Sequence, residues 1–137
     1  TFAISHPERN GVMTIGANDW EDYAVESTVQ FVHAEYAGLV ARAKGHRNYY
    51  AGVFGGGQIK IIKRQGPDVT VLAVSDKTYR EGDWHDLRLE VKGDRLTFLV
   101  DGEEAVVAQD NTFASGSTGY VVDEGAIVAK YFIVSAI

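Results

Sequence analysis

The sequence has 137 residues, of which 45% are hydrophobic, and this is enough for one domain, 1–137, that buries roughly two thirds of its unfolded surface. It contains no cysteine, which excludes disulfides and thiolate metal sites. Nineteen acidic and thirteen basic residues give a formal charge of -6, which disfavours nucleic acid as a partner. No apolar run approaches the ~20 residues that a membrane helix needs, so we expect no membrane partner.

The first third of the chain predicts three strands. Short candidates at 2–4 and 12–15 flank a polar loop, and a longer strand follows a turn at 18–20. Apolar residues alternate with polar or small ones along that longer strand, the period expected of a strand with one face in a core. Its apolar positions are Tyr23, Val25, Val29 and Phe31.

Four more strands are predicted at 39–44, 49–54, 59–63 and 69–74, joined by turns rich in glycine. No stretch of this region shows the period of 3.6 residues that is typical of an amphipathic helix.

The strongest signal is the segment 84–107, which predicts a meander of three strands. Its apolar positions alternate with charged or polar ones, and the pairs at 93–94 and 101–102 suit hairpin turns. With final strands at 119–122 and 126–135, the chain predicts an all-β, antiparallel two-sheet β-sandwich. The expected core comprises Tyr23, Val25, Val29, Phe31, Leu87, Leu89, Val91, Leu96, Phe98 and Val100.

The common catalytic patterns are missing from the sequence. It has no phosphate-binding glycine loop, no Gly-x-Ser-x-Gly element and no metal-binding spacing among His6, His33, His46 and His85. Asp83, Asp86 and Glu90 are close in sequence, but a solvated strand face explains them more simply than a catalytic carboxylate pair. We therefore expect a binding domain and no catalytic residues.

The segment 36–50 has the residue types of a sugar-binding surface. Aromatic rings stack on the apolar face of a pyranose, while arginine and asparagine bond its hydroxyls. The candidate ligand-binding residues are Tyr36, Arg42, His46, Asn48, Tyr49 and Tyr50. The alternative is that the tyrosines fill the core and the charges solvate a loop.

Strand register decides which tyrosine of this segment faces the ligand. If Lys44 pairs with Tyr49, then Arg42 and Tyr49 share a face and Tyr50 is in the core. A slip of one residue makes Tyr50 the companion of Arg42 instead. Both registers remain open.

Arg42 is the expected anchor of the site because it interrupts a small, apolar strand. The alternative is that it is neutralised by Glu26 on the preceding strand. We expect Arg42→Ala to abolish glycan binding while the thermal midpoint stays within a few degrees.

Four segments together resemble the concanavalin A-like lectin/glucanase superfamily, in its laminin G-like jelly-roll branch. They are GLVARA at 38–43, NYYAGVF at 48–54, GQIKIIKR at 57–64 and WHDLRLEVKGDRLTFLVDGEEAV at 84–106. Within that branch the chain is similar to carbohydrate-binding modules of glycoside hydrolases. It is also similar, through NDWEDYAVESTVQF at 18–31, to a β-sandwich domain of bacterial ADP-ribosylglycohydrolases.

The resemblance implies a jelly roll and a non-catalytic, lectin-like carbohydrate-binding module of a larger glycan-active or ADP-ribose-active enzyme. An accessory domain without a glycan ligand is the alternative, and a jelly-roll glycoside hydrolase is the third reading. The expected partners are a glycan and a neighbouring catalytic domain. A carbohydrate-binding module would be extracellular and an ADP-ribosylglycohydrolase domain cytoplasmic, and the initial threonine suggests a mature or excised domain.

Related modules often hold a structural calcium ion, so the resemblance also implies a calcium site. The candidate ligands in this sequence are Asp19, Glu21, Asp22, Asp123 and Glu124.

Overall fold

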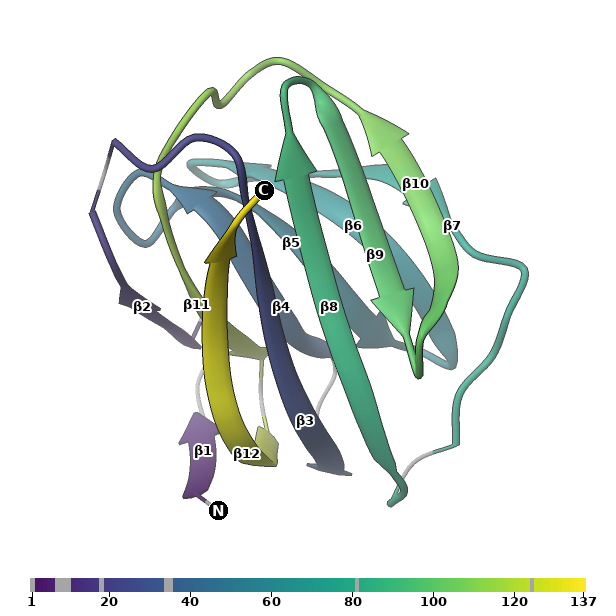
Figure 1. Ribbon diagram of the computed structural model, residues 1–137. Coiled ribbons are helices and arrows are strands. Elements are labelled where there is room, and N and C mark those ends of the chain that lie inside the picture. The colour runs from purple at the N-terminus through teal and green to yellow at the C-terminus, as the bar shows by residue number, and fades with distance from the viewer. Residues whose placement is uncertain (1, 7–10, 18, 34–35, 81, 124) are drawn as a thin grey trace.

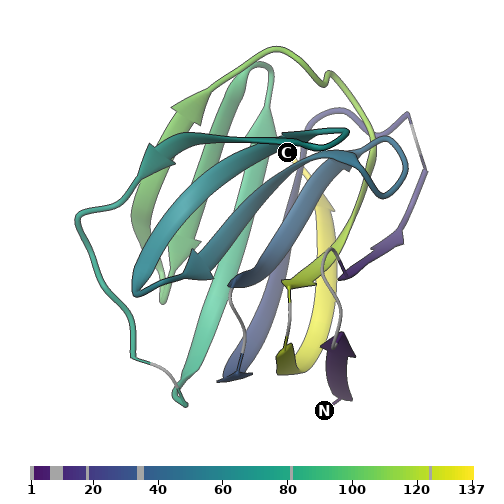
Figure 2. The same cartoon turned by 180° about the vertical axis from the view of Figure 1, so that it is seen from behind.

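The computed structural model describes residues 2–6, 11–17, 19–33, 36–80, 82–123 and 125–137. These residues form two antiparallel sheets that pack face to face (Figures 1 and 2). The sheet that lies in front in Figure 1, called the front sheet, has the order β1-β12-β3-β8-β9-β10, and the back sheet has the order β2-β11-β4-β5-β6-β7. The jelly-roll sandwich expected from the sequence is confirmed, and no helix in the described ranges is long and apolar enough to cross a membrane.

The strands of the front sheet are β1 (Phe2–His6), β12 (Gly125–Ala136), β3 (Tyr23–His33), β8 (Trp84–Lys92), β9 (Arg95–Val100) and β10 (Glu103–Gln109). Those of the back sheet are β2 (Gly11–Ile15), β11 (Ser117–Asp123), β4 (Tyr36–Ala43), β5 (Asn48–Gly55), β6 (Gln58–Gln65) and β7 (Asp68–Val74). The predicted meander is therefore β8, β9 and β10.

The core lies between the two sheets and contains the residues that strand alternation predicted. Nine of the ten expected core residues are buried, and Val100 is partly buried against the same cluster. Phe98 packs directly on the backbone of the back sheet, since a Cβ atom added to Gly52 would lie 2.5 Å from the Phe98 ring. Glycine is needed at position 52 because the ring occupies the space of a side chain.

Two bulges redirect side chains in the sandwich. In β4 the pairing with β11 shifts next to Arg42, which has a left-handed φ of 50°. In β12 the pairing with β3 shifts between Lys130 and Ile133, where Tyr131 has a φ of 35°. Because a bulge adds one unpaired residue and bends the strand, it can turn a side chain away from the face that alternation predicts.

Candidate functional site

Arg42 is a buried structural residue, contrary to the prediction that it anchors a ligand site. It is 1% exposed, and the bulge in β4 directs its guanidinium to the end of the sandwich. Its Nε donates to the Glu21 carbonyl at 3.0 Å, and its Nη1 donates to the carbonyls of Gly93 at 2.6 Å and Phe113 at 3.2 Å. Its Nη2 pairs with Asp22 Oδ1 at 3.1 Å, whereas Glu26 pairs with Arg88. The alternative expectation, that Glu26 neutralises Arg42, is therefore also wrong. The side chain is saturated by the protein.

Tyr49 and Tyr50 are both fully buried and point to opposite faces of β5, so neither offers a ring to solvent. Tyr50 lies in the core, as the first of the two expected registers required, but Lys44 does not pair with Tyr49; the ladder instead pairs Ala41 with Tyr50. The bulge in β4 lies in its pairing with β11, and the β4–β5 ladder runs to Ala41 and Tyr50 without a register shift.

The other predicted residues of the segment do not form one surface. His46 is exposed in the turn after β4, and half-buried Asn48 uses its Oδ1 to accept a hydrogen bond from the Gly66 amide at 3.3 Å. Tyr36 lies at the opposite end of β4, where it pairs with Gly55. The predicted site is therefore not assembled.

The acidic residues proposed for calcium do not come together either. Asp22 contacts Arg42 near the end of β4, whereas Asp123 pairs with Tyr36 at its start. Asp19 and Glu21 are exposed near Asp22, and Glu124 lies outside the described residues. No group of three or more His, Asp or Glu side chains in the described part of the chain could hold a metal ion.

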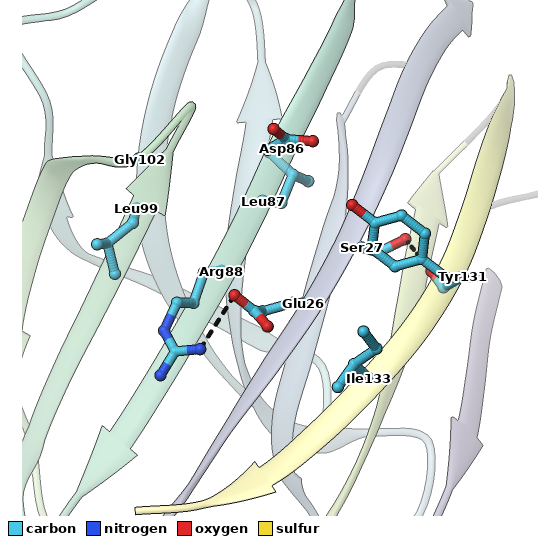
Figure 3. Close-up of a pocket in the computed structure, with 9 residues that line it drawn as sticks. All are labelled: Glu26, Ser27, Asp86, Leu87, Arg88, Leu99, Gly102, Tyr131 and Ile133. Carbon is cyan, nitrogen blue, oxygen red and sulfur yellow. Dashed lines mark hydrogen bonds and ion pairs between the residues drawn. The ribbon is translucent and has the colours of Figure 1, made fainter.

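A hollow with charged walls opens on the outer face of the front sheet. It has a volume of about 330 Å³ and lies over β3, β8, β9 and β12 (Figure 3). We call it the front hollow. The side chains that matter to its chemistry are Glu26, Asp86, Arg88, Leu99, Tyr131 and Ile133.

Arg88 lies at the centre of a network of half-exposed ion pairs in the front hollow. Its Nη1 lies 3.0 Å from Glu26 Oε1 and its Nε donates to Glu90 Oε2 at 2.8 Å. The hydrogen bond with Glu90 raises the pKa of Arg88, burial opposes this, and Glu26 adds to the rise. These two contacts hold the guanidinium in place through Nη1 and Nε. The third nitrogen, Nη2, takes part in neither of them.

Tyr131 covers the neighbouring part of the hollow and is 53% exposed. Thr28 Oγ1 donates to Asp86 Oδ1 at 2.6 Å and also lies 2.5 Å from the Tyr131 hydroxyl. Since Thr28 has one hydroxyl proton and the carboxylate can only accept, Tyr131 donates to Thr28. This relay fixes the ring and the carboxylate relative to each other.

Buried Ser27 fixes the bulge that carries Tyr131. Its Oγ donates to the Tyr131 carbonyl at 2.9 Å, and the Tyr120 hydroxyl lies 2.6 Å from the same oxygen. Figure 3 shows Ser27 beneath the Tyr131 ring. The exposed ring is therefore supported from inside the sandwich.

The front hollow was missed in the sequence because its residues come from distant segments. The charged face of β8, with Asp86 and Glu90, was interpreted as a solvated ladder, and Glu26 was considered only as a partner of Arg42. The signal was the period-two run of polar residues on the outward faces of both β3 and β8. Only the register, which pairs Glu26 with Arg88, shows that these faces are adjacent.

Comparison with known proteins identifies the family. A model described as the 3-keto-alpha-glucoside-1,2-lyase-like domain matches residues 3–129. The chain belongs to this family. No protein in a comparison with curated sequences matches it.

Solved structures show that this 3-keto-alpha-glucoside-1,2-lyase-like domain shares its jelly-roll fold with binding modules and with parts of enzymes. It is similar to the carbohydrate-binding module CBM66 from Bacillus subtilis, with a TM-score of 0.79 and 18% identity over 93% of this chain and 97% of that chain. It is similar to chicken galectin 2, with a TM-score of 0.65 and 15% identity over 91% of this chain and 100% of that chain. It also resembles the GH43 protein BlXynB from Bacillus licheniformis, with a TM-score of 0.72 and 14% identity over 98% of this chain and 32% of that chain.

These matches confirm the concanavalin A-like fold that the sequence motifs indicated. The expected link to bacterial ADP-ribosylglycohydrolases is not shown by them.

Proposed function

We propose that this domain binds a carbohydrate, and that the front hollow is the binding site. The observation that carries the proposal is the combination of an exposed, internally supported Tyr131 ring with the Arg88 and Glu26 pair beside it. A tyrosine ring can stack on the apolar face of a sugar while the charged groups bond its hydroxyls. The similarity in fold to a carbohydrate-binding module and a galectin supports this function.

The charge of the front hollow favours a neutral sugar over an acidic one. Glu26 and Glu90 pair with the Arg88 guanidinium, and Asp86 lines the same hollow, so three carboxylates stand against one guanidinium there. A uronic acid or a sulfated sugar would meet an excess of negative charge inside the hollow. The second oxygens of Glu26 and Asp86 and the Nη2 group of Arg88 take part in none of the contacts described above, and they offer acceptors and a donor to hydroxyls.

A glycan array followed by calorimetry tests the proposal. We expect at least one neutral glycan to bind with a Kd in the roughly micromolar to millimolar range and with little dependence on salt. Arg88→Ala and Tyr131→Ala should each weaken that binding by about tenfold or more. The matched control is Arg95→Ala on β9, which removes an exposed arginine 3.7 Å from Glu104, outside the front hollow. Unchanged binding in both hollow variants would contradict the assignment.

A second candidate function is cleavage of a 3-keto-α-glucoside, which the family description favours. A ketone at C3 acidifies the proton at C2, so a carboxylate base can remove it. The C1–O bond breaks as the C1=C2 bond forms, and the departing aglycone oxygen takes a proton from water. Glu26 and Asp86 are the carboxylates that line the front hollow. The product has a C1=C2 bond conjugated with the C3 ketone and absorbs in the ultraviolet. A rise in absorbance with methyl 3-keto-α-glucoside that Asp86→Asn abolishes would favour this function over binding alone.

We further propose that the domain accompanies a catalytic domain. The similarity to BlXynB covers 32% of that protein, which supports the view that a sandwich of this kind serves as one part of a larger enzyme. The flanking sequence of the full-length chain tests this proposal. If the domain is an accessory unit without a sugar ligand, it should bind the neighbouring domain and give no signal on the glycan array.

A further inference from the structure

An exposed tryptophan lies next to the front hollow on the same face of the front sheet. Trp84, Asp86 and Arg88 alternate along β8, so their side chains share the outward face. Trp84 is 37% exposed although it is large and apolar. Trp84 and Arg88 are four residues apart, about 13 Å along the strand, which is longer than one pyranose ring.

The register connects Trp84 to the hollow without a break. Trp84 pairs with Gln30, and the next outward position of β3, Thr28, pairs with both Asp86 and Lys130. Thr28 is also the residue that bonds Asp86 and Tyr131. The tryptophan and the tyrosine therefore lie on either side of one hydrogen-bonded row.

The Trp84 ring carries the ammonium group of an exposed lysine. Lys130 Nζ lies 4.3 Å from the ring centroid, and Lys130 itself is exposed. A cation–π contact at an exposed site is weak, so a sugar can displace the ammonium group from the ring. The displaced ammonium has three donors for the hydroxyls of that sugar.

We propose that Trp84 and Lys130 form a second subsite, so that the ligand is a neutral oligosaccharide of at least two units rather than a single sugar. This inference rests on the proposed function, since the first unit occupies the front hollow. Trp84 stacks on the second unit and Lys130 donates to its hydroxyls.

The test compares methyl α-glucoside, maltose and maltotriose as probes, chosen because the family description names an α-glucoside. Affinity should rise by about tenfold from the monosaccharide to the longer probes. Trp84→Ala should remove that rise and leave the affinity for methyl α-glucoside within about twofold. The control is Trp20→Ala, because Trp20 is equally exposed at 37% but lines a different cavity with Val134 and Ala136.

Fluorescence gives a second readout that does not depend on affinity. The chain has two tryptophans, so Trp20→Phe leaves Trp84 as the only indole. Maltotriose should change the emission of this variant, and methyl α-glucoside should not.

The outcomes separate the subsite from the proposed function. If all three probes bind with equal affinity and Trp84→Ala changes none of them, the second subsite is wrong while sugar binding in the hollow stands. If none of the probes binds, and no neutral glycan binds in the array, the proposed function is wrong and the subsite falls with it.

Discussion

Arg42 and Arg88 are arginines on two strands of the same sandwich, yet their surroundings differ in kind. The Arg42 side chain is 2% exposed, and three of its partners are backbone carbonyls. The Arg88 side chain is 29% exposed, and both of its partners are carboxylates on the same open face. A guanidinium held by backbone atoms ties segments of the fold together, whereas one held by flexible side chains at the surface can exchange partners with a ligand. The partners of an arginine, more than its presence on a strand, decide its role.

The largest expected effect is the loss of stability in Arg42→Ala. The change leaves Asp22 and three carbonyl groups without their buried partner, which should cost about 3–5 kcal/mol of unfolding free energy. The thermal midpoint should fall by roughly 10–17 °C. Arg95→Ala, which removes an exposed arginine, should change the unfolding free energy by less than about 0.5 kcal/mol. A midpoint for Arg42→Ala within a few degrees of the parent would restore the surface role that the sequence suggested.

Acid should weaken the hydrogen-bond network around Asp110. Burial by itself would raise the pKa of Asp110, but hydrogen bonds from Tyr50, Lys63 and Thr112 outweigh burial and hold the pKa well below the ordinary carboxyl range. Because the folded pKa lies below the unfolded value, Asp110 contributes stability above about pH 4, and this contribution is lost as the pH falls further.

The measurement is the thermal midpoint between about pH 6 and pH 2.5. At neutral pH, Asp110→Asn should lower the unfolding free energy by about 1–3 kcal/mol, and the thermal midpoint with it. The variant should also lose less thermal stability than the parent as the pH falls. Phe113 connects this network to Arg42. Its amide donates to the Tyr50 hydroxyl, and its carbonyl accepts from Arg42. An unchanged acid slope in the variant would show that other carboxylates govern the acid transition.

A smaller effect on stability is expected for Arg88→Ala. Exposed ion pairs contribute about 0–1 kcal/mol to stability. The unfolding free energy of this variant should therefore stay within about 1 kcal/mol of that of the parent, while its sugar affinity falls. Urea denaturation at two salt concentrations measures the first quantity. If Arg88→Ala instead loses as much stability as Arg42→Ala, the two arginines are both structural and the contrast between them fails.

The smallest expected effect is that of calcium on the thermal midpoint. The Arg42 guanidinium already occupies a cluster of three carbonyls and one carboxylate, oxygen ligands of the kind that calcium prefers. Calcium at about 10 mM exceeds the Kd of weak extracellular sites and should shift the midpoint by less than about 1 °C. Magnesium at the same concentration is the control for ionic strength. A larger shift specific to calcium would reveal a site that the Asp22 and Asp123 groups do not form.

Much of the fold could be predicted because strand alternation is local. Leu89 and Phe98 were assigned to the core from the residues on either side of them, and both are fully buried. The candidate site could not be predicted in the same way. Arg42 lies in a strand whose alternation is interrupted by a bulge, and Tyr131 lies in another, so counting by two fails at both positions.

The sequence by itself determined the β class, the meander of β8 to β10 and the side of each regular strand that enters the core, because burial of every second side chain is the main gain of a sandwich. Only the tertiary structure decided which polar residues meet. The two bulges buried Arg42 among carbonyls and exposed Tyr131 above Thr28, and the register of β3 with β8 placed Glu26 beside Arg88. The physical reason is that a bulge or a register depends on partners from distant parts of the chain, which a local pattern does not contain.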